Sequence, residues 1–122
     1  MRPFSVNKSN SLKSTSEIDA VFKDGSKLSS KLISLYYAKS KEHSRLRFTF
    51  SVGKKTHALA TTRNKLKRLM KEALRLNGHE FLSQNLPYNL VFIYFSSKEE
   101  SFKSVEESMK SLLLSFKNKK LS

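Results

Sequence analysis

The residues of this sequence that are best suited to bind a ligand lie between positions 62 and 77, where there are six basic side chains and a single acidic one, Glu72. The basic residues are Arg63, Lys65, Lys67, Arg68, Lys71 and Arg75. At about 100° per residue, most of them fall opposite a helical stripe of apolar residues, formed by Leu66, Leu69, Met70 and Ala73. A face that is only solvated usually mixes charges of both signs to form i,i+4 pairs. The pattern favours contact with nucleic acid over the alternative, a solvated surface helix in a basic protein.

The whole chain shares this charge bias. Its 122 residues contain 24 Lys and Arg against 10 Asp and Glu, which gives a net charge of +14 and a pI near 10.2. Self-repulsion of this size destabilises a compact chain, so it usually accompanies a polyanionic partner. The absence of cysteine excludes disulfides, a thiolate zinc site and a cysteine nucleophile. We expect a small cytoplasmic binder of an acidic partner, with no membrane span, no secretion signal and no small-molecule substrate.

Patterns typical of enzyme active sites are weak. The three histidines, His43, His57 and His79, fall in predicted loops or at helix ends without the spacing of a metal site, so each is expected to be solvated. Acidic pairs at 99–100 and 106–107 suit the first turns of a helix, where they complement its dipole. We therefore expect no catalytic side chain and no metal ligand.

The first half of the chain predicts one helix followed by strands. A helix is predicted at 15–23, begun by a capping box of Ser14 and Glu17 and ended by Gly25 in a left-handed conformation. The segment 32–38 alternates as a strand with Ile33, Leu35 and Tyr37 on one face and Tyr36 on the other. The segment 45–52 also alternates, and the two strands are predicted to pair as an antiparallel hairpin or meander.

The second half predicts the basic helix, an interior strand and a last helix. The basic helix spans 62–77, capped by Thr61 or Thr62 and stopped at Gly78. The segment 90–95 is apolar on both faces, as in an interior strand, and 101–117 has helical periodicity. With a further short strand near 27–30, the order is α-β-β-α-β-α, an α+β two-layer sandwich of about four strands and three helices. A single domain at 14–118 is expected between a basic flexible arm at 1–13 and a frayed tail at 119–122.

A family resemblance follows from the basic segment. Residues 60–71 read Ala-Thr-Thr-Arg-Asn-Lys-Leu-Lys-Arg-Leu-Met-Lys, which resembles the Arg-Asn-Arg signature of the bacterial ribonuclease P protein subunit. Val-Phe-Lys-Asp-Gly at 21–25 and Ser-Val-Gly-Lys-Lys at 51–55 agree with the family in order and spacing. The chain departs from the family at Lys65, which replaces an Arg, and at Ile18, which replaces a common Phe. It departs also in the loop at 54–60, which is one residue longer and lacks the usual glycine.

The resemblance implies a fold similar to the ribosomal-protein S5 domain 2-like fold, with a left-handed β-α-β crossover. It implies binding to the catalytic RNA of ribonuclease P, which cleaves precursor tRNA with Mg²⁺ held mainly by the RNA. The implied contacts to the catalytic RNA are Lys54, Lys55, Arg63, Asn64, Lys65 and Arg68. The implied contacts to the single-stranded 5′ leader of precursor tRNA are Ile18, Phe22, Tyr36, Arg63, Asn64, Lys67 and Lys71. Aromatic rings and cations are what a single strand requires.

Two other classes of protein remain as alternatives. A ribosomal or other structural RNA-binding protein would explain the charge without a role in cleavage. A protein-only nuclease would need an acidic metal cluster, which the sequence does not suggest. Cleavage of precursor tRNA by the catalytic RNA at low Mg²⁺, with and without the protein, separates these hypotheses.

Overall fold

The computed structural model describes residues 12, 15–40, 46–78 and 87–120. Within them the chain forms α1 (Thr15–Asp24), β1 (Ser26–Ser29), β2 (Ile33–Lys39), β3 (Arg47–Val52), α2 (Ala60–Asn77), β4 (Tyr88–Tyr94) and α4 (Phe102–Lys120). The α+β class with three helices and four strands is therefore confirmed, including the short strand near residue 27. The predicted arm at 1–13, apart from Leu12, lies outside the described residues, as do Ser14 of the capping box and residues 121–122 of the tail.

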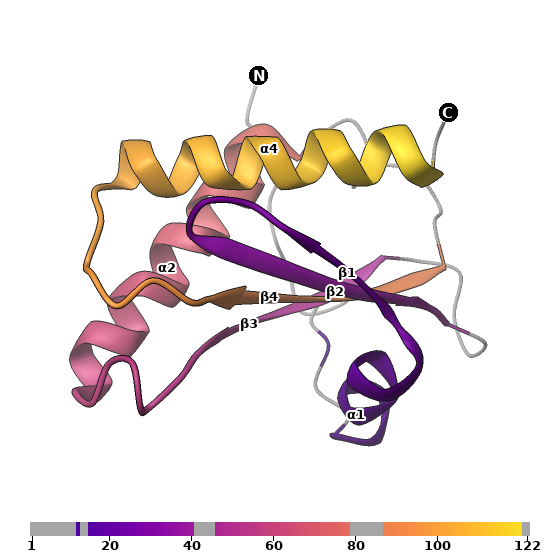
Figure 1. The fold of residues 1–122 in the computed structure, drawn as a ribbon, viewed down its shortest axis with the longest axis horizontal. Helices are drawn as coiled ribbons and strands as arrows, with labels where there is room; N and C mark the ends of the chain where they lie inside the picture. Colours follow the sequence, from indigo (N-terminus) through magenta and orange to yellow (C-terminus); the bar gives the residue numbers. More distant parts are fainter. Residues whose placement is uncertain (1–11, 13–14, 41–45, 79–86, 121–122) are drawn as a thin grey trace.

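The four strands form one mixed sheet in the order β1-β2-β4-β3 (Figure 1). The pairs β1–β2 and β2–β4 are antiparallel, and β3–β4 is parallel. The predicted hairpin between the second and third strands is wrong, because β4 lies between them: Leu90 pairs with Tyr37 on one side and with Phe48 on the other. The strand that is apolar on both faces, β4, is one of the two interior strands, and five of its seven residues are buried.

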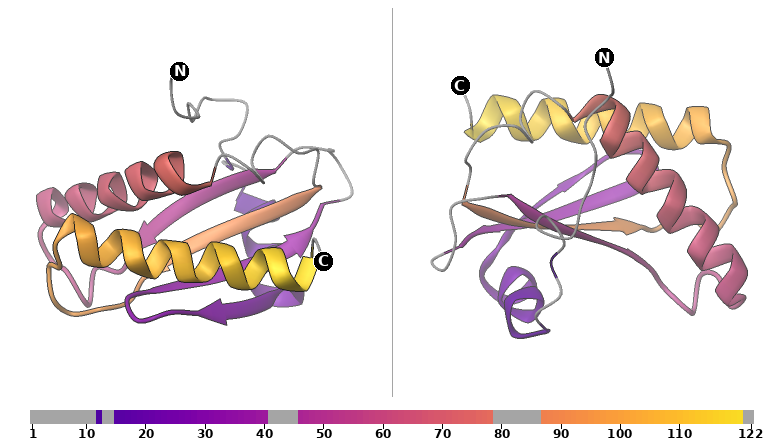
Figure 2. Two further views of the ribbon diagram at one scale, coloured as in Figure 1. Left: turned by 90° about the horizontal axis from the view of Figure 1, so that it is seen from above. Right: turned by 180° about the vertical axis from the view of Figure 1, so that it is seen from behind.

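Helices lie on both faces of the sheet but cover them unequally. Seen from above, α2 and α4 lie side by side across one face; seen from behind, α1 lies against the other (Figure 2). The face under α2 and α4, the closed face, carries the large core, with Leu35, Phe92 and Phe116 fully buried. The face under α1, the open face, has a small core of Leu12, Val21 and Val91. Most of the apolar burial is therefore on the closed face.

Gly25 is required at the end of α1 for a reason that the sequence does not reveal. None of the three glycines, all of which lie in the part of the chain that the structure describes, has a positive φ, so the predicted left-handed conformation is wrong. A Cβ atom at Gly25 would lie 2.3 Å from the carbonyl oxygen of Val21 and 2.6 Å from that of Tyr37. The chain turns from α1 into β1 this close to β2, and only a residue without a side chain fits.

The start of the basic helix also differs from its prediction. Helix α2 begins at Ala60 with Leu59 as its N-cap and without a side-chain cap, so Thr61 and Thr62 lie inside the helix and the predicted threonine cap is wrong. Its end is as predicted: Gly78 donates its N–H to the carbonyl oxygen of Leu74 at 2.8 Å. Helix α4 continues to Lys120, three residues beyond the predicted end.

Candidate nucleic-acid interface

The amphipathic pattern of α2 determines which of its residues meet solvent. Leu66, Met70, Ala73 and Leu74 are buried against the closed face of the sheet and α4. Since side chains three and four residues apart share a helix face, the opposite face of α2 must lie outward. The outward and flanking positions carry the six basic residues named above, which are mostly exposed. The helix therefore presents its charge as one continuous surface.

Three of these six cations are engaged within the protein. The guanidinium of Arg63 donates from one nitrogen to the carbonyl oxygens of His57, at 3.0 Å, and Ala58, at 2.7 Å. Lys65 forms an exposed ion pair with Glu99 at 3.1 Å. Arg75 pairs with Glu72 one helical turn away.

In the Glu72–Arg75 pair each partner shifts the protonation equilibrium of the other. The hydrogen bond from Arg75 lowers the pKa of the Glu72 carboxyl below its ordinary value. The same bond raises the pKa of Arg75. Both side chains are partly exposed, so water screens the pair and its contribution to stability is small.

The other three cations, Lys67, Arg68 and Lys71, are exposed and form no ion pair or hydrogen bond with any residue that the structure describes. Asn64 is exposed beside them. Unpaired cations on a rigid helix can neutralise phosphates without first breaking an internal bond, and such neutralisation dominates nucleic-acid affinity. This trio is the strongest electrostatic feature of the site.

Lys54 and Lys55 extend the basic surface beyond the helix. Both are exposed in the turn that follows β3, and neither has an ion pair within the described part of the chain. This turn leads into α2, so the two lysines and the helix trio belong to one basic region. The structure brings together the residues that the resemblance assigned to the catalytic RNA.

The leader-binding candidates Ile18, Phe22 and Tyr36 gather on the open face. The rings of Phe22 and Tyr36 meet edge to face, with 5.0 Å between their centroids. Phe22 is 45% exposed, and Tyr36 is half-buried. Ile18 packs into the small core under α1. The prediction that Tyr36 points away from Ile33, Leu35 and Tyr37 is confirmed, since those three lie in the large core.

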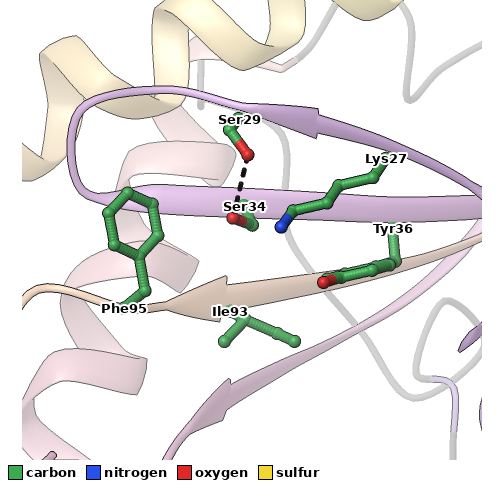
Figure 3. A pocket seen from close by; sticks show the side chains of 6 residues that line it. All are labelled: Lys27, Ser29, Ser34, Tyr36, Ile93 and Phe95. Carbon is green, nitrogen blue, oxygen red and sulfur yellow. Dashed lines mark hydrogen bonds between the residues drawn. The ribbon is translucent and has the colours of Figure 1, made fainter.

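A shallow pocket of about 250 Å³ lies beside Tyr36. Its lining side chains are Lys27, Ser29, Ser34, Tyr36, Ile93 and Phe95 (Figure 3). The Lys27 ammonium lies 5.4 Å from the Tyr36 ring centroid, and the hydroxyls of Ser29 and Ser34 are 3.1 Å apart. The pocket thus offers a ring, a cation and hydroxyls, the groups that bind unstacked bases and phosphates.

Sequence reasoning missed Lys27, Ser29, Ser34 and Phe95 as members of this site. Lys27 pairs with Tyr36, and Ser29 with Ser34, across the β1–β2 ladder. The sequence did predict a short strand near residue 27. It did not predict which residues of that strand pair with which residues of β2, and only this register places Lys27 and Ser29 beside Tyr36 and Ser34.

The structure does not join the two groups of leader-binding candidates directly. Arg63, Asn64, Lys67 and Lys71 belong to α2 on the closed face, whereas α1, which carries Phe22, lies on the open face (Figure 2). Tyr36 packs against the small core under α1. Strand β3 is the sheet edge on the side of α2. A nucleic acid that reaches both groups must pass around this edge.

The described residues contain no group of three or more His, Cys, Asp or Glu side chains placed to hold a metal ion. His57 is 8% exposed, so the prediction that it is solvated is wrong; His43 and His79 lie outside the described residues. Among the helices described, none is long and apolar enough to cross a membrane.

Comparisons with known proteins agree on one family. The chain matches the family described as Ribonuclease P over residues 6–117. It is 39% identical over 101 residues to the ribonuclease P protein component of Clostridioides difficile, covering 81% of this chain and 84% of that one. The solved RNase P protein of Staphylococcus aureus is similar with a TM-score of 0.76 at 23% identity, covering 90% and 97%. That of Thermotoga maritima is similar with a TM-score of 0.68 at 25% identity, covering 84% and 94%.

Proposed function

The chain belongs to the ribonuclease P protein family, and we propose that it binds the catalytic RNA of that enzyme and the 5′ leader of precursor tRNA. Its role is in tRNA processing by ribonuclease P, as family and fold agree. Membership also implies a ribonuclease P RNA as partner. The proposal is that the protein promotes endonucleolytic maturation of the tRNA 5′ end while the RNA supplies the catalysis. The proposal includes the cytoplasm as the place of this work.

The observation that carries the proposal is the unpaired trio Lys67, Arg68 and Lys71 beside Lys54 and Lys55. In the proposed complex these cations neutralise phosphates and release counterions, which supplies affinity without sequence preference. Arg63 and Lys65 contribute less, because Arg63 already donates to two loop carbonyls and Lys65 must exchange Glu99 for a phosphate.

The leader is proposed to lie on the open face. Tyr36 and Phe22 provide ring surfaces for unstacked bases, and Lys27 provides a cation beside the pocket. Base stacking tolerates sequence variation, because every base has an aromatic face. This suits a subunit that must accept the leaders of many different precursors.

Mg²⁺ enters the proposal as an ion of the RNA. Mg²⁺ prefers oxygen ligands in octahedral arrangement, usually carboxylates and phosphates. Among the described residues, no three His, Cys, Asp or Glu side chains lie together as such a site requires, and Glu72, Glu99 and Glu17 are each bound to an Arg, a Lys or an Asn. We therefore derive no step through a protein-held metal.

The proposal is tested by precursor tRNA cleavage with purified catalytic RNA at low Mg²⁺. Adding the protein is expected to raise the rate, because bound cations offset repulsion between the two RNAs. The protein alone, with Mg²⁺ and precursor tRNA, is expected to leave the substrate intact. A ribosomal or other structural RNA-binding protein would leave cleavage unchanged, and specific cleavage by the protein alone would overturn the division of labour.

A further inference from the structure

We propose that His57 is a positioning residue, which holds the turn at residues 53–57 so that Lys54 and Lys55 are presented to RNA in a fixed arrangement. The inference rests on the proposed RNA-binding function. It concerns a residue in the loop where the sequence departs from the family pattern. His57 touches no RNA in this proposal and acts through the two lysines.

The side chain of His57 is bound to the last residue of β4 and to the segment that follows this strand. Its Nε2 lies 2.8 Å from the carbonyl oxygen of Ser96. Because a carbonyl can only accept, Nε2 carries the hydrogen and donates. The imidazole also packs on the Tyr94 ring, with 5.8 Å between centroids. A loop histidine that is 8% exposed thus connects the basic turn to β4.

The backbone of His57 is held as firmly as its ring. Its N–H donates to the carbonyl oxygen of Gly53 at 3.0 Å, which closes the turn that contains Lys54 and Lys55. Its own carbonyl accepts from the Arg63 guanidinium at 3.0 Å. One residue therefore joins the turn, α2 and β4.

Tyr94 and the segment that follows it, to which His57 is bound, are themselves held by hydrogen bonds. The Tyr94 hydroxyl donates to the carbonyl oxygen of Lys98 at 2.5 Å and accepts from the Glu100 N–H at 3.1 Å. Glu99 of the same segment pairs with Lys65 of α2. Segment 95–101 is thus bound to both β4 and α2, and His57 transmits its rigidity to the turn.

A rigid turn favours binding because ordering flexible lysine side chains on RNA costs conformational entropy. Fixing rotamer-rich side chains and their loop on binding reduces affinity, and a loop held in its bound shape avoids part of that cost. Without the Nε2 hydrogen bond, the carbonyl of Ser96 loses this donor and the turn loses its hydrogen bond to the segment that follows β4. Lys54 and Lys55 would keep their charges but lose their fixed arrangement.

The test is a double-mutant cycle with the full chain and the purified catalytic RNA. His57→Phe keeps an aromatic ring on Tyr94 but removes the donor, and His57→Gln keeps a donor without the ring. Each is made in the wild-type background and in the Lys54→Ala/Lys55→Ala background. The measurements are RNA affinity, the melting temperature, and hydrogen exchange at the amides of residues 54–56.

His57→Phe is expected to reduce affinity about three- to tenfold, the factor for the ordering of one or two side chains, and to speed exchange in the turn. It should have no further effect once both lysines are alanine. His57→Gln should restore most of the affinity. Equal losses in both backgrounds, or unchanged affinity and exchange, would overturn the inference.

Failure of this inference is distinct from failure of the proposed function. Lys67→Ala/Lys71→Ala serves as the reference variant, because it removes helix cations that His57 does not position. If this variant loses affinity and His57→Phe does not, only the role of His57 is wrong. If neither variant weakens RNA binding, the proposed RNA surface itself is wrong.

Discussion

The two faces of the sheet divide the work of this protein. The closed face under α2 and α4 buries a continuous apolar core, whereas the open face under α1 keeps a half-buried tyrosine, an exposed phenylalanine and a pocket lined by hydroxyls. The strands serve both faces at once, because successive side chains point in opposite directions. Substitution of one residue can therefore reduce stability while substitution of its neighbour on the same strand reduces RNA affinity, and this difference can be tested.

The largest expected effect is on the closed face. Phe92 is fully buried and stacks on Phe50 at 5.5 Å, so Phe92→Ala should cost about 3–5 kcal/mol of stability through lost burial and a cavity. Equilibrium unfolding in urea measures this loss. Ile93→Ala is the matched control, because Ile93 is the next residue on β4 and faces the half-covered pocket. A loss at Ile93 as large as that at Phe92 would contradict the division between the faces.

Local pattern predicted which face each residue takes. The alternation at 32–38 placed Tyr36 opposite Tyr37 correctly, since a period of two is a property of the strand itself. The amphipathic stripe of α2 was predicted correctly because the helical period of 3.6 residues is likewise a local property of the chain. Three helices and four strands follow from such local signals.

Partners distant in the sequence could not be predicted. Alternation at 45–52 marks a half-buried strand but not whether its neighbour runs parallel, so the residue pattern missed the parallel pairing of β3 with β4, which only the β-α-β crossover of the resembling family implied. Lys65 meets Glu99 across 34 positions, and His57 meets Ser96 across 39. Tertiary contacts between distant residues thus determine which cations of α2 are unpaired and which histidine is buried. A local sequence pattern does not contain this information.

The next effect tests the open face. Tyr36→Ala should reduce affinity for precursor tRNA by about 1–3 kcal/mol, the usual range when a base-stacking ring is removed. Affinity of the holoenzyme for mature tRNA should change little, because mature tRNA has no leader. Binding of the two RNAs is measured side by side, together with a thermal melt.

The control for Tyr36 is its neighbour on the same strand. Tyr37→Ala removes a ring that is 4% exposed and packs on Phe116 at 5.2 Å. It should lower the melting temperature far more than Tyr36→Ala does. Equal losses for precursor and mature tRNA in Tyr36→Ala, with a sharply lowered melting temperature, would assign Tyr36 to the core instead.

A smaller effect compares the outward side of α2 with that of α4. Lys67→Ala/Lys71→Ala should flatten the log–log salt dependence of RNA binding by about one to two units, at ~0.7–0.9 per lost phosphate contact. Lys103→Ala/Lys110→Ala removes the same charge from exposed positions of α4 and should leave the slope nearly unchanged. Equal slopes for both double variants would mean that total charge, rather than the α2 surface, determines binding.

The smallest effect concerns the Glu72–Arg75 pair, which lies on the outer side of α2 away from both cores. Arg75 lowers the pKa of Glu72 below its ordinary 4.5, so the folded state binds a proton at Glu72 less readily than the unfolded chain does. The stabilisation is therefore complete above pH 4.5 and disappears as the pH falls through the lowered pKa of the folded state. Glu72→Gln should melt slightly below the wild type at pH 7, and the gap should close in acid. Glu107→Gln, which removes an exposed carboxylate of α4, controls for the loss of one negative charge. A gap that stays constant from neutral pH into strong acid would show that Arg75 does not stabilise the ionised form of Glu72.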